Sequence, residues 1–349
     1  MESKWKRSIV CLVLLLGILS MTAVSANKDR IGTAGAQELL VPVGARGVAL
    51  GGSSMVFNSG VEALYWNPAG LGRIDHSVEA LFSHMSYIAD INVNYGAVAV
   101  QAGDFGTLGF ALKTVSFGDI PLTTELFPDG TGDTYSPTFM TLGATYSKLL
   151  TDRISVGVTA TLVTEKILST SASDLAFDVG IQYHNLGIQG LQLAVAVKNI
   201  GPSMTFTGSD LQKTAIASGA LRPAEGYAVQ AAAVDLPSSM EIGVGYERKF
   251  DEKNSAELGV MFRNNNYQDD EYNFGGEYNF QNLFFLRGGY TFSPQTDKDL
   301  TGSRGYIYDY TLGAGLHYAV GGVDLAFDYA YRHVKYFDAN NVISLRLGF

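Results

Sequence analysis

The sequence predicts an all-β protein: a transmembrane antiparallel β-barrel of about 14 strands, with an N-terminal segment folded inside it as a hatch. Three observations support this fold class. Side chains alternate with period two from Ser77 to the end of the chain, the connections between alternating segments sort into short and long ones, and an apolar, glycine-rich stretch, Gly47–Gly72, precedes them. We therefore expect a hatch in residues 27–76 and a barrel in residues 77–349.

The alternation gives each predicted strand one apolar face and one face of small or polar residues. Residues 323–331 place valine, leucine, phenylalanine and tyrosine on one face, and aspartate and alanine on the other. In hydrocarbon every backbone N–H and C=O must be paired internally, so strands can span a membrane only as a closed barrel. Two soluble β-sandwich domains are the alternative. Small residues cover a lipid-facing surface poorly, which favours the apolar face as the outer one.

The small and polar face would then line the lumen. Charged side chains would be costly in lipid, whereas inside they can meet water, one another or the hatch. The polar residues that we expect to point into the lumen are Lys113, Asp174, Asp178, Asp324, Asp328 and Arg346.

The connections between the predicted strands alternate in length. Residues 102–105, 150–152 and 320–321 are short connections, whereas residues 118–135 and 201–237 are long ones. Successive connections of an up-and-down membrane barrel lie on opposite sides of the membrane, with short periplasmic turns and long outer loops. A soluble sandwich has no reason to sort its connections in this way. An even number of strands also places both ends of the barrel on the periplasmic side.

The N-terminus has the form of a secretory signal peptide, which we assign to residues 1–26. Basic residues precede an apolar core, Ile9–Met21, and small residues lead to a cleavage site after Ala26. A membrane-anchoring helix is the alternative, but the apolar core is short for one. The single cysteine, Cys11, lies in this segment, so the mature chain would contain no disulfide. These features predict the outer membrane of a diderm, Gram-negative-type bacterium.

Net charge limits the partners. Residues 1–26 carry Lys4, Lys6, Arg7 and Glu2, a net charge of +2, so their removal changes the stated net charge of −10 to −12. An acidic chain with scattered cations is a poor nucleic-acid binder, because nucleic acids require a basic stripe. Outer-membrane lipid is the partner that the predicted barrel does require.

The sequence offers no catalytic or metal-binding constellation, so we expect neither an enzyme nor a cofactor. The five histidines are scattered, without the spacing of metal ligands. Asp324 and Asp328 share a strand face but are separated by about 13 Å, too far for a catalytic carboxylate pair. The acidic segment 268–271 reads as a solvated loop; a calcium site is the alternative, although its ligand pattern is incomplete.

Within Gly47–Gly72, the residues Val61–Trp66 have helical composition, and Pro68 biases Asn67 towards an extended backbone, so a short helix should end at Trp66. The stretch ALGGSS at 49–54, followed by ALYWNPAGL at 63–71, resembles the N-terminal signature of PorV/PorQ-like outer-membrane proteins, which belong with the FadL-type fatty-acid transporters. Residues 177–180, 197–202 and 235–240 fit the same group.

This resemblance implies a fourteen-stranded barrel with an internal hatch that contains Asn67, Pro68, Ala69 and Gly70. The same turn could merely seal the lumen. For PorV-like proteins the resemblance implies a non-enzymatic, secretion-associated (type IX-like) role, in which the barrel binds a translocon and exported proteins. For FadL-type proteins it implies a channel for hydrophobic small molecules, which we keep as the alternative.

The two functions make different demands on the barrel. Partner binding would use the outer loops 118–135 and 201–237, whose apolar residues should be exposed. These residues are Ile120, Leu122, Leu126, Phe127, Met204 and Phe206. Transport predicts an apolar pocket beside residues 67–71, whereas a polar, fully plugged lumen would favour partner binding.

Overall fold

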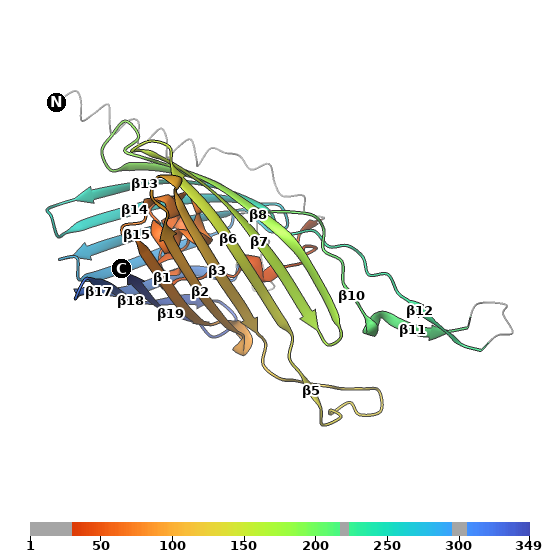
Figure 1. Ribbon diagram of the computed structural model, residues 1–349. Helices are drawn as coiled ribbons and strands as arrows, with labels where there is room; N and C mark the ends of the chain where they lie inside the picture. The colour runs from red at the N-terminus through yellow and green to blue at the C-terminus, as the bar shows by residue number, and fades with distance from the viewer. Residues whose placement is uncertain (1–29, 217–222, 295–305) are drawn as a thin grey trace.

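The computed structural model describes residues 30–216, 223–294 and 306–349, so the expected signal peptide lies outside the described residues. A closed antiparallel barrel of 14 strands confirms the predicted fold class (Figure 1). The barrel strands are β1 (Val78–Ser86), β2 (Asn92–Gln101), β3 (Thr107–Ser116), β6 (Thr138–Leu149), β7 (Ile154–Ile167), β8 (Thr170–His184), β9 (Leu191–Ile200), β13 (Ser239–Lys249), β14 (Ser255–Asn265), β15 (Glu271–Phe280), β16 (Phe284–Phe292), β17 (Tyr308–Val320), β18 (Val323–Val334) and β19 (Asn340–Gly348).

Each barrel strand pairs with its neighbours in the sequence. The ring closes where β1 pairs with β19, and β8 pairs with β9 across a bulge near Asp178. One end of the barrel has only short turns among the described connections, and the other end carries the long ones, which makes it the outer end. Not every outer connection is long: β8 begins at Thr170 rather than near residue 174, so only residues 168 and 169 separate it from β7.

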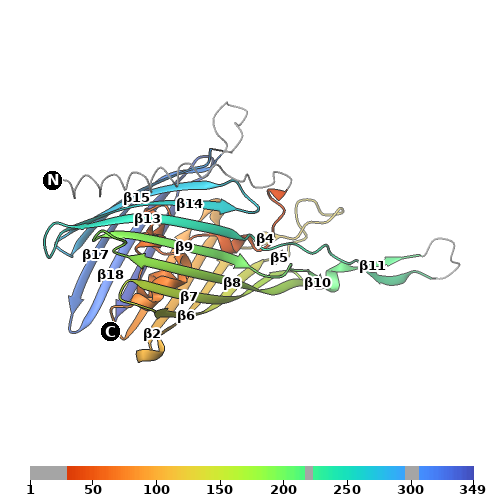
Figure 2. The same cartoon turned by 90° about the horizontal axis from the view of Figure 1, so that it is seen from above.

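Two outer loops contain strands of their own. Residues 117–137 hold β4 (Ile120–Pro121) and β5 (Thr134–Tyr135), and the connection from β9 to β13 holds β10 (Thr207–Gly208), β11 (Gln212–Ala215) and β12 (Glu225–Ala228). The β11–β12 hairpin extends well beyond the barrel wall (Figure 2).

The barrel wall has an apolar outer surface and a small or polar inner one. Leu258 and Leu286 point outward and are 67% and 64% exposed. Alternate residues of the same two strands face inward and are mostly glycine, polar or charged, as in Glu257, Gly259 and Arg263 of β14 and Arg287, Gly289 and Thr291 of β16. A closed ring with an apolar exterior is the form in which strands cross a bilayer, so the protein is an outer-membrane barrel. None of the helices in the described residues is long and apolar enough to cross a membrane.

The N-terminal segment folds inside the barrel as a series of short helices (Figure 1). They are η2 (Gln37–Leu40), α2 (Ala45–Ala49), η3 (Ser53–Val56), η4 (Gly60–Glu62), α3 (Ala63–Trp66) and η5 (Pro68–Arg73). We call residues 30–73 the hatch. As predicted, α3 ends at Trp66 because Asn67 is extended, with φ −157° and ψ 111°. The buried apolar cluster at the centre of the molecule forms between the hatch and the inner face of the wall.

One expectation about the outer loops is wrong. Met204 is fully buried, and Phe206, Ile120 and Leu122 are partly buried, whereas we expected all four to be exposed for partner binding. Met204 and Phe206 pack with Ala36 and Leu39 of the hatch and with Leu236 at the other end of the same loop. The root of the long loop therefore covers the outer end of the hatch, and this packing removes its apolar residues from water.

Candidate functional site

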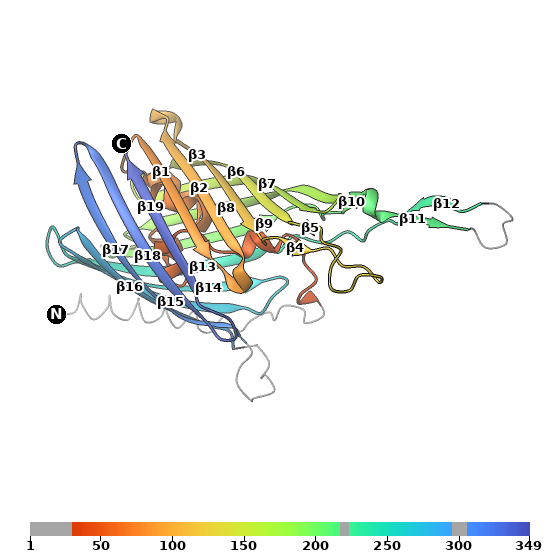
Figure 3. The same ribbon diagram turned by 90° about the horizontal axis from the view of Figure 1, so that it is seen from below.

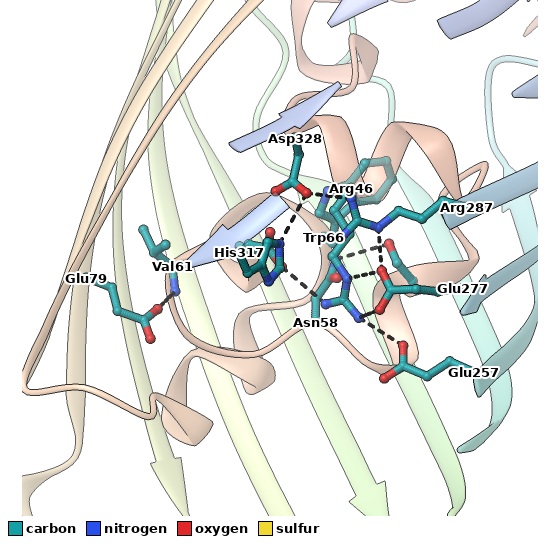
Figure 4. A network of polar contacts seen from close by, with 12 residues as sticks. Arg46, Asn58, Val61, Trp66, Glu79, Glu257, Glu277, Arg287, His317 and Asp328 are labelled. Carbon is teal, nitrogen blue, oxygen red and sulfur yellow. Dashed lines mark hydrogen bonds and ion pairs between the residues drawn. The ribbon is translucent and has the colours of Figure 1, made fainter. Parts of the chain in front are cut away.

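The hatch and its seat in the barrel wall form the candidate site. One side of the seat is charged. From α2, Arg46 donates hydrogen bonds to Glu277 on β15 (Nε to Oε2, 2.9 Å), to Glu257 on β14 (NH2 to Oε2, 2.9 Å) and to Glu62 within the hatch (NH1 to Oε2, 3.2 Å) (Figure 4). Glu257 and Glu277 are direct cross-strand partners. Two like charges in that position destabilise a sheet, and the guanidinium of Arg46 offsets their repulsion by binding both.

The charged side continues around the wall. Glu277 also accepts a hydrogen bond from Arg287 on β16, and NH1 of Arg287 lies 2.5 Å from Oδ1 of Asp328 on β18. His317 on β17 lies 3.3 Å from the same oxygen. Arg46 is thus linked to β14 and β15 by its own ion pairs. Through Glu277, Arg287 and Asp328 the same network extends to β16 and β18. The backbone of α2 adds direct contacts, since Thr311 Oγ1 donates to the Ala49 carbonyl (2.7 Å) and Ala45 N donates to Ser344 Oγ (2.8 Å).

Glycine contacts hold the opposite side of the seat, and Gly275 and Gly289 make similar contacts with residues 50 and 51 on the charged side. The helix η5 packs against β6, β7 and β8. A Cβ atom on Gly157 would overlap the carbonyl of Pro68, and one on Gly180 would overlap the side chain of Asn67. Ser147 adds a polar contact, because its Oγ accepts a hydrogen bond from Gly72 N at 3.0 Å. The hatch backbone therefore lies directly on the wall, where any larger inward residue would displace it.

The four residues assigned to the hatch by resemblance are all buried in this contact. Asn67 caps η5, accepting a hydrogen bond from Ala69 N through Oδ1 at 3.1 Å. The carbonyl of Ala69 lies 3.0 Å from Ser147 Oγ, and a Cβ atom on Gly70 would overlap the carbonyl of Asn58. The sequence Asn67-Pro68-Ala69-Gly70 thus builds a capped turn that fits the glycine surface of the wall.

Tyr65 forms a third attachment, between two lysines. Nζ of Lys113 and Nζ of Lys198 lie 4.8 and 4.3 Å from the centre of its ring. Lys113 also donates to the Val41 carbonyl at 3.1 Å, and Lys198 donates to the Tyr65 carbonyl at 2.7 Å. A cavity of about 50 Å³ lies beside Tyr65 and Leu64. Its wall side is lined by threonines and small residues of β3, β6 and β7 together with Asp178.

A buried acid pair lies at the outer end of the hatch. Burial, and then the negative charge of Glu165 on β7, raise the pKa of Glu38 in η2 to about 8. Glu38 is therefore largely protonated at neutral pH, and it can share its proton with Glu165.

The predicted lumen residues are distributed rather than gathered at one point. Lys113, Asp178 and Asp328 are buried on the inner face, and the first two line the same small cavity. Asp174, Asp324 and Arg346 lie on the inner faces of β8, β18 and β19. Nε2 of His76 lies 2.6 Å from Oδ2 of Asp324, and Arg346 lines a cavity of about 400 Å³ at the short-turn end.

Sequence reasoning missed the charged side of the seat. The residues it missed are Arg46, Glu62, Glu257, Glu277 and Arg287. One signal was available, because Arg46 is the only cation between Arg30 and Arg73. Across the described chain, no group of three or more histidine, cysteine, aspartate or glutamate residues is arranged to hold a metal ion.

No family model and no curated protein matches this chain. Solved structures do match its fold. The toluene transporter TodX of Pseudomonas putida is 14% identical, with a TM-score of 0.52 over 87% of this chain and 96% of that one. A FadL homologue of Pseudomonas aeruginosa is 14% identical, with a TM-score of 0.51 over 88% and 98%.

The monoaromatic hydrocarbon channel CymD is 12% identical, with a TM-score of 0.50 over 88% of this chain and 97% of that one. The fold is that of the FadL-type channels. At these identities the likeness establishes the fold, and the function must be argued from the site.

Proposed function

We propose that this protein is a channel through which hydrophobic small molecules diffuse across the outer membrane, with the hatch as its movable part. The observation that carries the proposal is the seat of the hatch: its charged side and the side opposite both pack closely on wall glycines, but the charged side, towards β14–β18, also depends on the buried ion pairs of Arg46. Three solved structures with the same fold are described as a toluene transporter, a hydrocarbon channel and a FadL homologue, which supports the same substrate class.

The described hatch fills the lumen, so a substrate can pass only if part of the hatch moves. The expected pocket beside residues 67–71 is replaced by close packing on Gly157 and Gly180. The small cavity lies beside Tyr65 instead, and both apolar and polar residues line it. We place the movable part around Arg46, because water that enters on that side can solvate Arg46 and its carboxylate partners, a compensation that the uncharged contacts of residues 67–72 do not have.

Uptake in whole cells tests the proposal. The protein is expressed in a diderm host that lacks hydrocarbon channels, and the uptake of radiolabelled toluene and oleate is measured. We expect uptake of at least one label above that of cells expressing an unrelated porin at equal level. Uptake of a small hydrophilic sugar should stay at background, because the hatch closes the lumen to water. Background uptake of both hydrophobic labels would overturn the proposal.

A second candidate function is a secretion-associated, type IX-like role in partner binding, and one observation favours it. Leu126 and Phe127, in the outer loop between β4 and β5, are 86% and 58% exposed. Apolar residues exposed to this extent on a projecting loop fit protein contact. Purification from solubilised outer membranes tests this candidate. A translocon or exported protein that is retained by the native chain and lost with Leu126→Ser/Phe127→Ser would favour it, whereas identical eluates would count against it.

A further inference from the structure

The outer surface of the wall carries a groove that the transport function does not use. It has a volume of about 420 Å³ and lies on β19, β1, β2 and β3, which are adjacent in the ring (Figure 3). Gly96 forms its floor, because the glycine points outward between the larger side chains of Phe82 and Leu112. A Cβ atom at Gly96 would meet nothing closer than Phe82 Cδ1, at 3.9 Å, so the notch is open.

Strand register orders the outward side chains of these four strands into rows. The row that contains the notch is apolar and consists of Leu345, Phe82, Gly96 and Leu112. The next row towards the outer end is mostly polar and consists of Ile343, His84, Asn94 and Thr114. The last row is entirely polar and consists of Asn341, Ser86, Asn92 and Ser116. Successive rows are about 7 Å apart along a strand, so polarity begins directly above the notch.

The outer end of β14–β18 has a different character. Its outward residues include stacked aromatic rings, with ring centres 5.3 Å apart for Tyr272 and Phe292 and 4.7 Å apart for Tyr310 and His333. Aromatic girdles of this kind are usual at a membrane interface. On β19–β3 the corresponding rows offer hydrogen-bonding groups instead.

The polar row above the notch has unused hydrogen-bonding capacity. His84 Nδ1 and Asn94 Oδ1 lie 2.8 Å apart and satisfy each other. The amide nitrogen of Asn94 and the hydroxyl of Thr114 can then interact with a molecule outside the wall. Both residues line the groove, together with Phe82, Leu112 and Leu345.

We infer that this groove is a binding site for one outer-leaflet lipid, with its acyl chain in the Gly96 notch and its ester, amide or hydroxyl groups on His84, Asn94 and Thr114. The wall faces the bilayer, so a lipid is the molecule that meets the groove. The order of polarity along the strands matches the order along a lipid, from headgroup to chain. The inference depends on the membrane-spanning fold and not on the transport function.

Photo-labelling tests the site. The protein is reconstituted in vesicles of phosphatidylethanolamine and phosphatidylglycerol that contain a phosphatidylethanolamine with a diazirine in its acyl chain. After illumination, labelled peptides are mapped by mass spectrometry. We expect label concentrated on β1–β3, and its loss in Gly96→Leu, which fills the notch. Gly288→Leu is the matched control. Gly288 also points outward, a Cβ atom there would meet its nearest atoms at 3.9 Å, and the residue lies on the distant strand β16.

A second arm addresses the polar row. In native mass spectra of detergent-extracted protein, Asn94→Leu should retain about fivefold less phosphatidylethanolamine than the unmodified chain, the ratio expected from the loss of one hydrogen bond. Heat-modifiability on gels confirms that each variant is folded. Equal labelling of Gly96→Leu and Gly288→Leu, label spread evenly around the barrel, or cross-linked dimers in place of lipid adducts would each overturn the inference.

Discussion

The two sides of the hatch are held in the barrel by different interactions. Towards β14–β18, Arg46 forms ion pairs with carboxylates of two strands and of the hatch itself. Towards β6–β8, η5 packs on Gly157 and Gly180 without an ion pair. Residues 50–53 pack in the same way on glycines of β14, β15 and β16, so the ion pairs are what distinguishes the two sides. When a buried ion pair opens, water can solvate the two charges, whereas uncharged close packing gains no such compensation and has no intermediate position. The comparison therefore divides the hatch into a part that can move and a part that cannot.

The largest expected effect comes from fixing each side with a cystine. The mature chain would contain no other cysteine. A Cβ atom at Gly259 on β14 would lie 3.4 Å from Ser53 Oγ and 3.0 Å from the Ser53 carbonyl oxygen, and one at Gly72 would lie 2.9 Å from Ser147 Oγ, so both pairs are close enough for a disulfide. We expect oxidised Ser53→Cys/Gly259→Cys to reduce toluene and oleate uptake to background. Oxidised Gly72→Cys/Ser147→Cys should leave uptake unchanged.

Reduction provides the internal control for both pairs. A reductant should restore uptake through the first pair and have no effect on the second, and each single-cysteine variant should behave as the unmodified chain. If the second pair blocks uptake and the first does not, then the movable and fixed sides have been assigned the wrong way round. If neither pair matters, the hatch does not move during uptake.

The next largest effect is expected from Arg46→Met. The substitution leaves Glu257 buried without its cation, opposite Glu277, which keeps only Arg287, and removing one partner of a buried pair costs about 3–5 kcal/mol. We expect faster hydrogen exchange in residues 45–52 and little change in residues 67–72. Arg248→Met is the control, because Arg248 is exposed and takes no part in the seat. Equal loss of protection in both segments would show that the hatch opens as one unit.

How much of this could be predicted depends on whether a residue follows a repeating pattern. Period-two alternation in segments such as 323–331 predicts strands, their number and the outward face, because each strand repeats the same constraint. The ion pairs of Arg46 could not be found in this way, since they join residues 16 to 231 positions apart and depend on register and on how the hatch enters the lumen. The burial of Met204 could not be predicted for the same reason, because it depends on the contact between the root of the loop and the hatch.

A smaller effect is expected on the glycine side. Gly180→Ala places a Cβ atom where the Asn67 side chain lies, and such overpacking typically costs about 1–3 kcal/mol. Exchange should increase in residues 67–72 and stay unchanged around Arg46, the reverse of the Arg46→Met pattern. Gly288→Ala introduces the same methyl group on the lipid-facing surface and should leave both segments unaffected. A Gly180→Ala protein with native protection at residues 67–72 would mean that the contact has room to adjust.

The smallest effect should appear where the hatch joins β1, as a pH dependence. His76 Nδ1 lies 3.2 Å from Glu79 Oε1, and its Nε2 lies 2.6 Å from Asp324 Oδ2, so both nitrogens of the charged ring can donate. Partial burial lowers the pKa of His76, but the hydrogen bonds and charges of Glu79 and Asp324 outweigh it and raise the pKa above 6.5. Asp75, His317 and Arg346 line the same cavity and also face this group.

Because the folded-state pKa of His76 is raised, its stabilisation is complete below pH 6.5 and is lost as the pH rises through the folded-state pKa. Hydrogen exchange at residues 74–79, corrected for its intrinsic pH dependence, should therefore accelerate over that interval in the native chain. It should be pH-independent in His76→Gln. His84→Gln, on the lipid-facing surface, should retain the native profile. A native pH profile in His76→Gln would show that the contacts of His76 with Glu79 and Asp324 do not hold this junction.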